Sequence, residues 1–352
     1  MLNKKNVKRQ TYLLLGGISI ALIIGLVILY RLYDRIYGSN IIIQEQLTAY
    51  IHIPTKSTMD DVTRILDTSG FLQDKNQFRW LAEKKNYPNH IHPGRYLIED
   101  GMSNNALINM LRSGRQDPVN LVFNNIRTKR QLAGVISKQI EADSNVIFRL
   151  LQNEQYLQRF HFTPQTVQAM FIPNTYEVWW DTSAREFMER MNREYQRFWN
   201  GRRKRKAEQL GFNPVEISIL ASIVDEETLR DEEMPKIAGV YINRLKRGMR
   251  LQADPTIKFA IGDFSIKRVL DKHLKVESPY NTYKHGGLPP GPISFPSIAA
   301  IEAVLHYQNH DYLYFCAKPD FSGYHNFSVS HRQHILNARQ YQQALNRRKI
   351  TE

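Results

Sequence analysis

Uncharged, mostly apolar residues form one unbroken run near the N-terminus, TYLLLGGISIALIIGLVILY, from Thr11 to Tyr30. At about 1.5 Å per residue, a helix of this length spans the hydrocarbon core of a bilayer, which is about 30 Å thick. Bulky and charged residues follow, RLYDRIYG, without the small-residue cleavage site typical of a signal peptide. The pattern predicts a retained transmembrane helix over residues 11–31. The alternatives are a cleaved signal peptide and a buried core helix.

Basic residues dominate the short segment before this run: Lys4, Lys5, Lys8 and Arg9. The positive-inside rule therefore places residues 1–10 in the cytoplasm as a tail. Everything after Tyr30 is expected on the extracytoplasmic, or periplasmic, side. The expected localisation is the cytoplasmic (inner) membrane, which the chain crosses once.

Alternating and helical patterns predict a small α+β module over residues 41–123. Its expected order is strand, helix, helix, strand, helix, strand, from AYIHIP at the start to PVNLVF at the end. Thr55, Ser57 or Thr58 can cap the first helix, and Gly70 ends it. The following residues, 124–209, are mostly helical in pattern and predict a connecting region.

The connecting region contains a basic run, GRRKRK, at residues 201–206. Two interpretations are open: a contact for a polyanion, or a solvated helix end or loop. Residues 210–348 follow as a second functional unit.

This second unit opens with a helix signal at Asn213. Asn as N-cap, Pro214 at the first helical position and Glu216 three residues after the cap are typical of a helix start. The apolar run VEISILASIVDEET continues at helical spacing and ends in carboxylates.

The carboxylates at the end of this helix are not equivalent. At about 100° per residue, Leu220, Ile223 and Glu227 fall on one stripe. Asp225 points almost to the opposite side, and Glu226 lies on the margin. Burial of Glu227 would raise its pKa, as a general acid near neutral pH requires. The alternative is that Glu227 is solvated or caps its neighbour.

Composition narrows the possible functions. The 352 residues carry a formal net charge of +14, which suggests a negative partner: nucleic acid, an anionic membrane surface or an acidic substrate. The predicted anchor argues against nucleic acid.

The single cysteine, Cys316, excludes an internal disulfide framework, and its aromatic, strand-like surroundings predict burial. His90 and His92 are a weak metal pair, and we expect no metal site.

A long loop segment, SPYNTYKHGGLPPGPISFPS, combines Tyr280 and Tyr283 with Pro, Gly and small polar residues. Carbohydrate clefts use this mixture, with aromatic faces for sugar rings and fixed polar groups for hydroxyls. A plain rigid surface loop is the alternative.

Four segments now carry a family resemblance: ASIVDEET, VYINRLKRGMRLQADPT, SPYNTYKHGGLPPGPISFPS and YLYFCAKPDFSGYHNFSVSHRQH. In this order they resemble the motifs of the endolytic murein transglycosylase, or YceG-like, family. The resemblance implies an α+β protein with an N-terminal transmembrane helix, a small LysM-like α+β module and a larger mixed α+β catalytic domain over residues 210–348.

The resemblance also implies an activity: cleavage of the β-1,4 bond between N-acetylmuramic acid (MurNAc) and N-acetylglucosamine (GlcNAc) within glycan strands. The products have 1,6-anhydro ends, and the reaction terminates nascent chains without a cofactor or metal. The implied partners are peptidoglycan glycan strands and the membrane, with wall-synthesis enzymes as further candidates and no nucleic acid. A lysozyme-like muramidase and a catalytically silent wall-binding scaffold are the alternative functions.

The family's catalytic glutamate, the last carboxylate of I-(V/I)-E-K-E-T, falls on Glu227. This chain has Asp225 and Glu226 where the pattern commonly has Glu and Lys, so we expect these two like charges to affect the pKa of Glu227. Further cleft residues are expected among the polar positions of the later motifs: Gln252, Asp254, Asn281, Tyr283 and His325.

Overall fold

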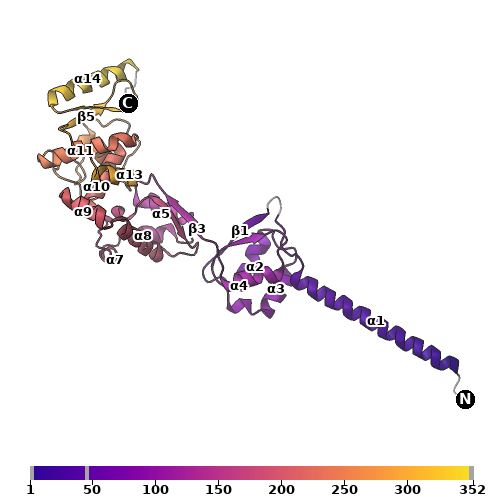
Figure 1. Ribbon diagram of the computed structural model, residues 1–352. Coiled ribbons are helices and arrows are strands. Elements are labelled where there is room, and N and C mark those ends of the chain that lie inside the picture. The colour runs from indigo at the N-terminus through magenta and orange to yellow at the C-terminus, as the bar shows by residue number, and fades with distance from the viewer. Residues whose placement is uncertain (1–3, 44–46, 349–352) are drawn as a thin grey trace. The chain divides into compact units, whose positions relative to one another are not determined.

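The computed structural model describes residues 4–43 and 47–348 (Figure 1). The first three residues of the expected tail, and the side chains of Lys4, Lys5 and Lys8, lie outside the described part. The chain forms two compact units. One comprises the residues up to Val119 together with Glu177–Asp181, and the other comprises Asn120–Tyr176 and Thr182 onward.

Helix α1, Lys4–Tyr37, carries the apolar run. It is the one helix of the described chain that is long and apolar enough to cross a membrane, and its apolar window is not buried in the protein. The alternative of a buried core helix is therefore wrong. The C-terminal end of α1 instead contacts the small unit (Figure 1): the Arg35 guanidinium lies 4.1 Å from the ring centre of Trp80, and Asn104 donates a hydrogen bond to the Arg35 carbonyl.

The small unit has the predicted order of elements up to its last helix. They are β1 (Thr48–Ile53), α2 (Met59–Thr68), α3 (Lys75–Lys84), a short 3-10 helix (Tyr87–Asn89), β2 (Gly94–Glu99) and α4 (Asn104–Ser113). Strands β1 and β2 pair antiparallel. Their inward residues, among them Ile51, Ile53 and Tyr96, pack with apolar residues of the three helices in one core.

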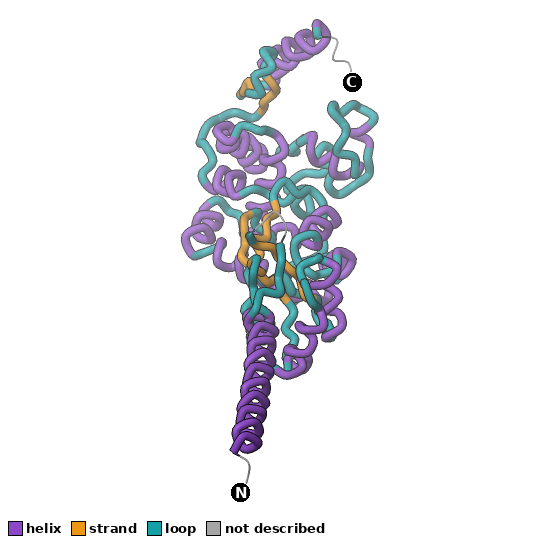
Figure 2. Tube along the Cα trace, turned by 90° about the vertical axis from the view of Figure 1, so that its right-hand side faces the viewer, coloured by secondary structure: helices purple, strands orange, loops and turns teal. Residues whose placement is uncertain are grey.

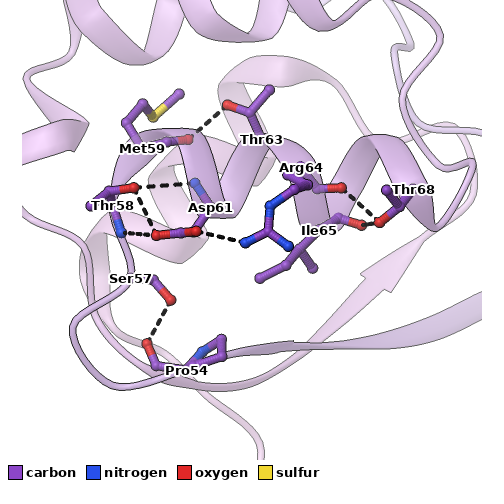
Figure 3. A network of polar contacts seen from close by, with 9 residues as sticks. All are labelled: Pro54, Ser57, Thr58, Met59, Asp61, Thr63, Arg64, Ile65 and Thr68. Carbon is purple, nitrogen blue, oxygen red and sulfur yellow. Dashed lines mark hydrogen bonds and ion pairs between the residues drawn. The ribbon is translucent and has the colours of Figure 1, made fainter.

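Thr58 is the residue that caps α2 (Figure 3). Its hydroxyl accepts a hydrogen bond from the Asp61 amide at 3.3 Å, and the Asp61 carboxylate accepts one from the Thr58 amide at 2.9 Å. This reciprocal pair is the capping box that T-x-x-D permits at a helix start.

The strand β3, Val119–Phe123, forms as predicted but does not complete the small sheet. It pairs with β4, Asn174–Val178, whereas β1 pairs with β2. The sequence predicts β3 as a strand but predicts no partner for it, and the partner is β4. The alternating pattern of VNLVF indicates a half-buried strand, but it does not identify a partner about fifty residues further along.

Helices make up most of the segment that follows β3. They are α5 (Lys129–Ser137), α6 (Ser144–Leu150), α7 (Glu154–Gln158), the 3-10 helix Val167–Met170, α8 (Ala184–Phe198) and α9 (Gly201–Gln209). Buried aromatic side chains hold them together, with the Phe171 ring centre 5.8 Å from those of Phe187 and Phe295.

Helix α10, Pro214–Glu227, lies at the centre of the second unit and packs against α11 (Met234–Lys246), α12 (Asp254–Ile261) and α13 (Ile298–Leu305). The predicted cap is confirmed, since the Asn213 and Glu216 side chains form a capping box. Residues 217–224 are all buried, so α10 is covered on every side. The expected single apolar stripe is therefore too narrow a description of this helix.

A hairpin and a helix end the described chain (Figure 2). Strands β5 (Tyr314–Ala317) and β6 (His325–Ser328) pair antiparallel, and α14 (His331–Arg347) packs beside them. Short 3-10 helices lie at Asp231–Glu233 and His273–Lys275. Cys316 is only half-buried, so its predicted burial is wrong. A sheet of two strands leaves part of its surface uncovered.

Candidate active site

Glu227 is the last residue of α10, and its carboxylate faces Tyr241 on α11. The Tyr241 hydroxyl donates a hydrogen bond to Glu227 Oε1 at 2.5 Å, and Tyr241 is only 1% exposed. Burial raises the pKa of Glu227 from 4.5 to about 7, against the lowering effect of this hydrogen bond. At neutral pH such a carboxyl is divided between its acid and base forms, which suits both donation and acceptance of a proton.

The charges that act on Glu227 come from α11 and α12. The negative charge of Asp254 raises its pKa, and the positive charges of Lys258 and Arg244 lower it. Asp225 and Glu226 are not among the causes. Asp254 therefore acts more strongly on the pKa of Glu227 than these two neighbours do, and the effect of Asp225 and Glu226 stays a prediction. Each of the two has a partner of its own in the site.

A cavity of about 510 Å³ lies at the end of α10. Glu227 lines it, and so do Asp225 and Glu226, although the helical wheel predicts that they point elsewhere. The reason is that the helix ends at Glu227, so side chains from different faces of its last turn border the same space. Other lining residues come from neighbouring segments: Asn125, Ile126, Arg127, Thr228, Met234, Ser294, Phe295 and Ser297.

Asp225 holds the start of α13. Its two carboxylate oxygens accept hydrogen bonds from the Ser297 amide at 2.9 Å and the Ser297 hydroxyl at 2.7 Å. Ser297 in turn caps α13 by accepting from the Ala300 amide. Asp225 therefore joins two helices, and burial raises its pKa.

Glu226 is paired with Arg127, a residue that the sequence analysis missed. Arg127 Nε lies 2.9 and 3.0 Å from the two Glu226 oxygens, and Arg127 Nη2 lies 2.9 Å from Glu226 Oε2. The Arg127 guanidinium also lies 5.3 Å from the ring centre of Phe264. The ion pair borders both the main cavity and a smaller one of about 90 Å³.

Of the predicted cleft residues near α12, Asp254 and Tyr283 interact with one another and with Glu227. Asp254 accepts a hydrogen bond from the Tyr283 hydroxyl at 2.5 Å. The charge of Asp254 raises the pKa of Glu227, and burial together with the charges of Asp254 and Glu227 raises the pKa of Tyr283. Gln252 is exposed and has a left-handed backbone at φ 51°. Its backbone N–H donates a hydrogen bond to the Thr282 carbonyl at 3.2 Å. The structure therefore brings Asp254 and Tyr283 together directly.

The side chains of Asn281 and His325 differ from those of Asp254 and Tyr283 in their hydrogen-bond partners. Asn281 is fully buried, and its amide nitrogen donates to the carbonyls of Leu274 and Val276, so it holds the loop in shape. His325 on β6 forms a pair with Glu233, Nδ1 to Oε2 at 2.8 Å. The Phe315 ring lies between His325 and Tyr241 and contacts both of their rings.

Comparison with known proteins identifies the family. The family model for YceG-like proteins matches residues 51–340. The chain belongs to the YceG-like family. A protein of Bacillus subtilis (strain 168) named endolytic murein transglycosylase is 30% identical to it over 290 residues, 77% of this chain and 79% of that protein.

Two further YceG-family comparisons agree. A protein of the same name from Streptococcus pneumoniae serotype 2 (strain D39 / NCTC 7466) is 26% identical over 303 residues. The match covers 76% of this chain and 54% of that longer protein. A crystal structure of a yceG-like protein from Listeria monocytogenes shares the fold, with a TM-score of 0.56 and 24% identity over 82% of this chain and 98% of that one.

Two residues of this YceG-like site escaped the sequence analysis, for different reasons. Tyr241 lies within the quoted motif VYINRL, where a tyrosine in an apolar helix is a signal that its hydroxyl needs a partner. Arg127 lies in no motif and is brought to Glu226 only by the fold. Within residues 4–43 and 47–348, no group of three or more His, Cys, Asp or Glu side chains is arranged to hold a metal ion.

Proposed function

We propose that the protein is a membrane-anchored endolytic lytic transglycosylase that cleaves the MurNAc-β-1,4-GlcNAc bond within peptidoglycan glycan strands. The observation that carries this proposal is the Glu227 carboxyl, which borders a large cavity, has a pKa of about 7 and is held by Tyr241. The names of the two relatives support the same substrate and reaction.

In the proposed reaction, protonated Glu227 first donates its proton to the glycosidic oxygen of the leaving GlcNAc, and the bond from that oxygen to C1 of MurNAc breaks. The C6 hydroxyl of the same MurNAc then forms a bond to C1 and gives its proton to the Glu227 carboxylate. The products are a GlcNAc 4-hydroxyl and a 1,6-anhydro-MurNAc end. No water enters, and the carboxyl returns to its starting form.

The contacts of the other cavity carboxylates support a single catalytic acid. Hydrolysis with two carboxylates needs a second group free to act as nucleophile or base. Asp225 is occupied by Ser297, and Glu226 by Arg127. The third, Asp231, is exposed on the 3-10 helix that follows α10. A lysozyme-like muramidase is the alternative, because all three carboxylates still border the cavity.

The deciding experiment uses the full-length protein in detergent micelles and purified glycan strands, with the products measured by mass spectrometry. Anhydro ends are expected from the wild type, and free reducing ends would instead establish the muramidase. Glu227→Gln keeps the shape of the side chain but cannot donate the proton. It should reduce the rate by about 1,000- to 10,000-fold, the upper range for general acid catalysis.

Asp225→Asn and Glu226→Gln are the matched controls, since each removes one carboxylate of the same cavity. Both should stay within about tenfold of the wild-type rate, because each lost contact holds structure and does not move a proton. If Asp225→Asn is as inactive as Glu227→Gln, two carboxylates share the chemistry.

The substrate-binding and domain assignments belong to the same proposal. Gln252, Asp254, Asn281, Tyr283 and His325 are assigned to the substrate cleft, with Asp254 and Tyr283 best supported by their link to Glu227. Residues 210–348 are assigned as the catalytic domain and 124–209 as the connecting region.

The remaining assignments concern the anchored part of the chain. Residues 41–123 are assigned as a LysM-like module, and 11–31 as an anchor in the cytoplasmic (inner) membrane with residues 1–10 inside. An enzyme anchored there would act on nascent strands and terminate them, and wall-synthesis enzymes are its proposed neighbours.

A further inference from the structure

A second cavity, the α9–α13 pocket, borders the basic run that the proposed reaction leaves unused. Its volume is about 310 Å³, and it lies between α9 and the C-terminal end of α13. From α9, the lining residues include Arg202, Arg205, Lys206 and Gln209. These positions follow the i, i+3, i+4, i+7 spacing of one helix face. The basic run therefore directs a row of cations to one hollow of the surface.

One carboxylate is already held in this pocket. Arg203 Nε donates to Glu302 Oε1 at 2.7 Å, and His306 Nδ1 lies 3.3 Å from Glu302 Oε2. Arg203 is itself fixed, because its Nη1 donates to the Phe198 carbonyl at 2.9 Å and its guanidinium lies 4.1 Å from the ring centre of Phe198. The pocket thus contains a rigid guanidinium–carboxylate pair.

Three cations remain beside this pair. Within the described chain, Arg202, Arg205 and Lys206 form no ion pair with a carboxylate. Guanidinium and ammonium groups bind carboxylates and phosphates, and guanidinium does so through two parallel hydrogen bonds. A ligand with anionic groups therefore complements this pocket.

Helix α13 connects the pocket to the active-site cavity. Its cap, Ser297, lines the cavity, and its last residue, Leu305, lines the pocket. An eight-residue helix is about 12 Å long, so the two hollows are separated by about that distance. A polymer bound in the cavity can therefore reach the pocket with groups that branch from it.

We propose that the α9–α13 pocket binds carboxylate groups of the peptide stems on the glycan strand that occupies the active-site cavity. This inference rests on the proposed function, because it takes the strand as substrate. The pocket then makes the enzyme prefer peptide-bearing strands over bare glycan, through binding and not through the chemical step.

The test compares peptide-bearing strands with strands from which the peptides have been removed, with full-length protein in detergent at low salt. The triple variant Arg202→Gln, Arg205→Gln, Lys206→Gln should raise KM for peptide-bearing strands by about 5- to 30-fold, with kcat unchanged. Its KM for bare glycan should stay within about twofold of the wild type. The matched control removes three exposed cations from α14, Arg332→Gln, Arg339→Gln and Arg347→Gln, and should leave both KM values unchanged.

A second variant is expected to lower KM, which general damage to the fold would not do. Glu302→Gln removes the resident carboxylate and frees Arg203, so it should lower KM for peptide-bearing strands by about two- to threefold. A higher KM in this variant, or an equal rise of KM on bare glycan in the triple variant, would overturn the inference.

Binding measurements separate this inference from the proposed function. The dissociation constant of peptide-bearing strands is measured with Glu227→Gln, alone and combined with the triple variant. If the wild type cleaves nothing, the proposed function fails whatever the binding shows. If cleavage occurs but the triple variant leaves binding unchanged, the inference fails alone. It also fails if the triple variant loses affinity only for sodium polyphosphate, because the pocket is then a phosphate site.

Discussion

At the scale of single residues, two neighbours of Glu227 change its pKa in opposite directions. The Tyr241 hydrogen bond stabilises the carboxylate and lowers the pKa, whereas the charge of Asp254 raises it. Tyr241→Phe should therefore raise the pKa, and Asp254→Asn should lower it, each by about half to one pH unit.

The measurement is the pH dependence of kcat/KM. The reaction needs protonated Glu227, so activity should fall as pH rises through about 7, the folded pKa. This alkaline limb should move to higher pH in Tyr241→Phe and to lower pH in Asp254→Asn. Shifts of the same sign in both variants would show that the two contacts do not act through Glu227.

The same raised pKa has a consequence for stability. Between pH 4.5 and about 7 the unfolded state loses the Glu227 proton while the folded state keeps it, so the folded state loses stability across this range and regains none above it. Glu227→Gln carries no such charge, so at pH 8 it should be more stable than the wild type by about 1 to 3 kcal/mol. Denaturant unfolding at several pH values tests this. The difference should disappear below pH 4.5, where the carboxyl is protonated in both states.

The sequence predicts a site residue only where the neighbouring residues in the chain indicate its role. The position of Glu227 behind a capped apolar run predicts a buried acid. No local signal pairs Arg127 with Glu226, because the two are far apart in the chain and meet through tertiary packing. Asp254 acts more strongly on the pKa of Glu227 than the adjacent Asp225 and Glu226 do, and this too results from tertiary packing.

At the scale of elements, Gly291 fixes the loop that leads to the cavity. A Cβ added at Gly291 would lie 2.0 Å from the Gln165 backbone oxygen, whereas at Gly286 of the same loop it would meet nothing within 4 Å. Gly291→Ala should therefore destabilise the protein by about 1 to 3 kcal/mol through overpacking. Gly286→Ala is the matched control and should be nearly neutral. Thermal unfolding measures both, and equal melting temperatures would contradict the close approach.

Elements were more predictable than their partners. The caps at Thr58 and Asn213 follow from short motifs, because a capping side chain binds backbone groups only a few residues away. The pairing of β3 with β4 and the burial of α10 on every side depend on segments distant in sequence. Local patterns contain no information about such contacts.

At the scale of the whole molecule, the N-terminal helix gives a prediction about processing. If α1 is a retained anchor, the full-length protein should stay in the membrane fraction at high salt and keep its first residues, because hydrophobic insertion is not screened by ions. Fractionation with N-terminal peptide mapping measures this. A protein shortened to about residue 35 would show a cleaved signal peptide instead.

The packing of the end of α1 onto the small unit limits the distance of that unit from the predicted bilayer surface. The Arg35–Trp80 contact and the Asn104 hydrogen bond join α1 to the small unit. Only the seven residues 31–37 lie between the predicted bilayer edge at Tyr30 and the end of α1. At 1.5 Å per residue this is a stand-off of about 10 Å. If α1 is anchored as proposed, the small unit stays within about that distance of the bilayer. It could then meet only the wall material next to the membrane, and layers further out would lie beyond its reach.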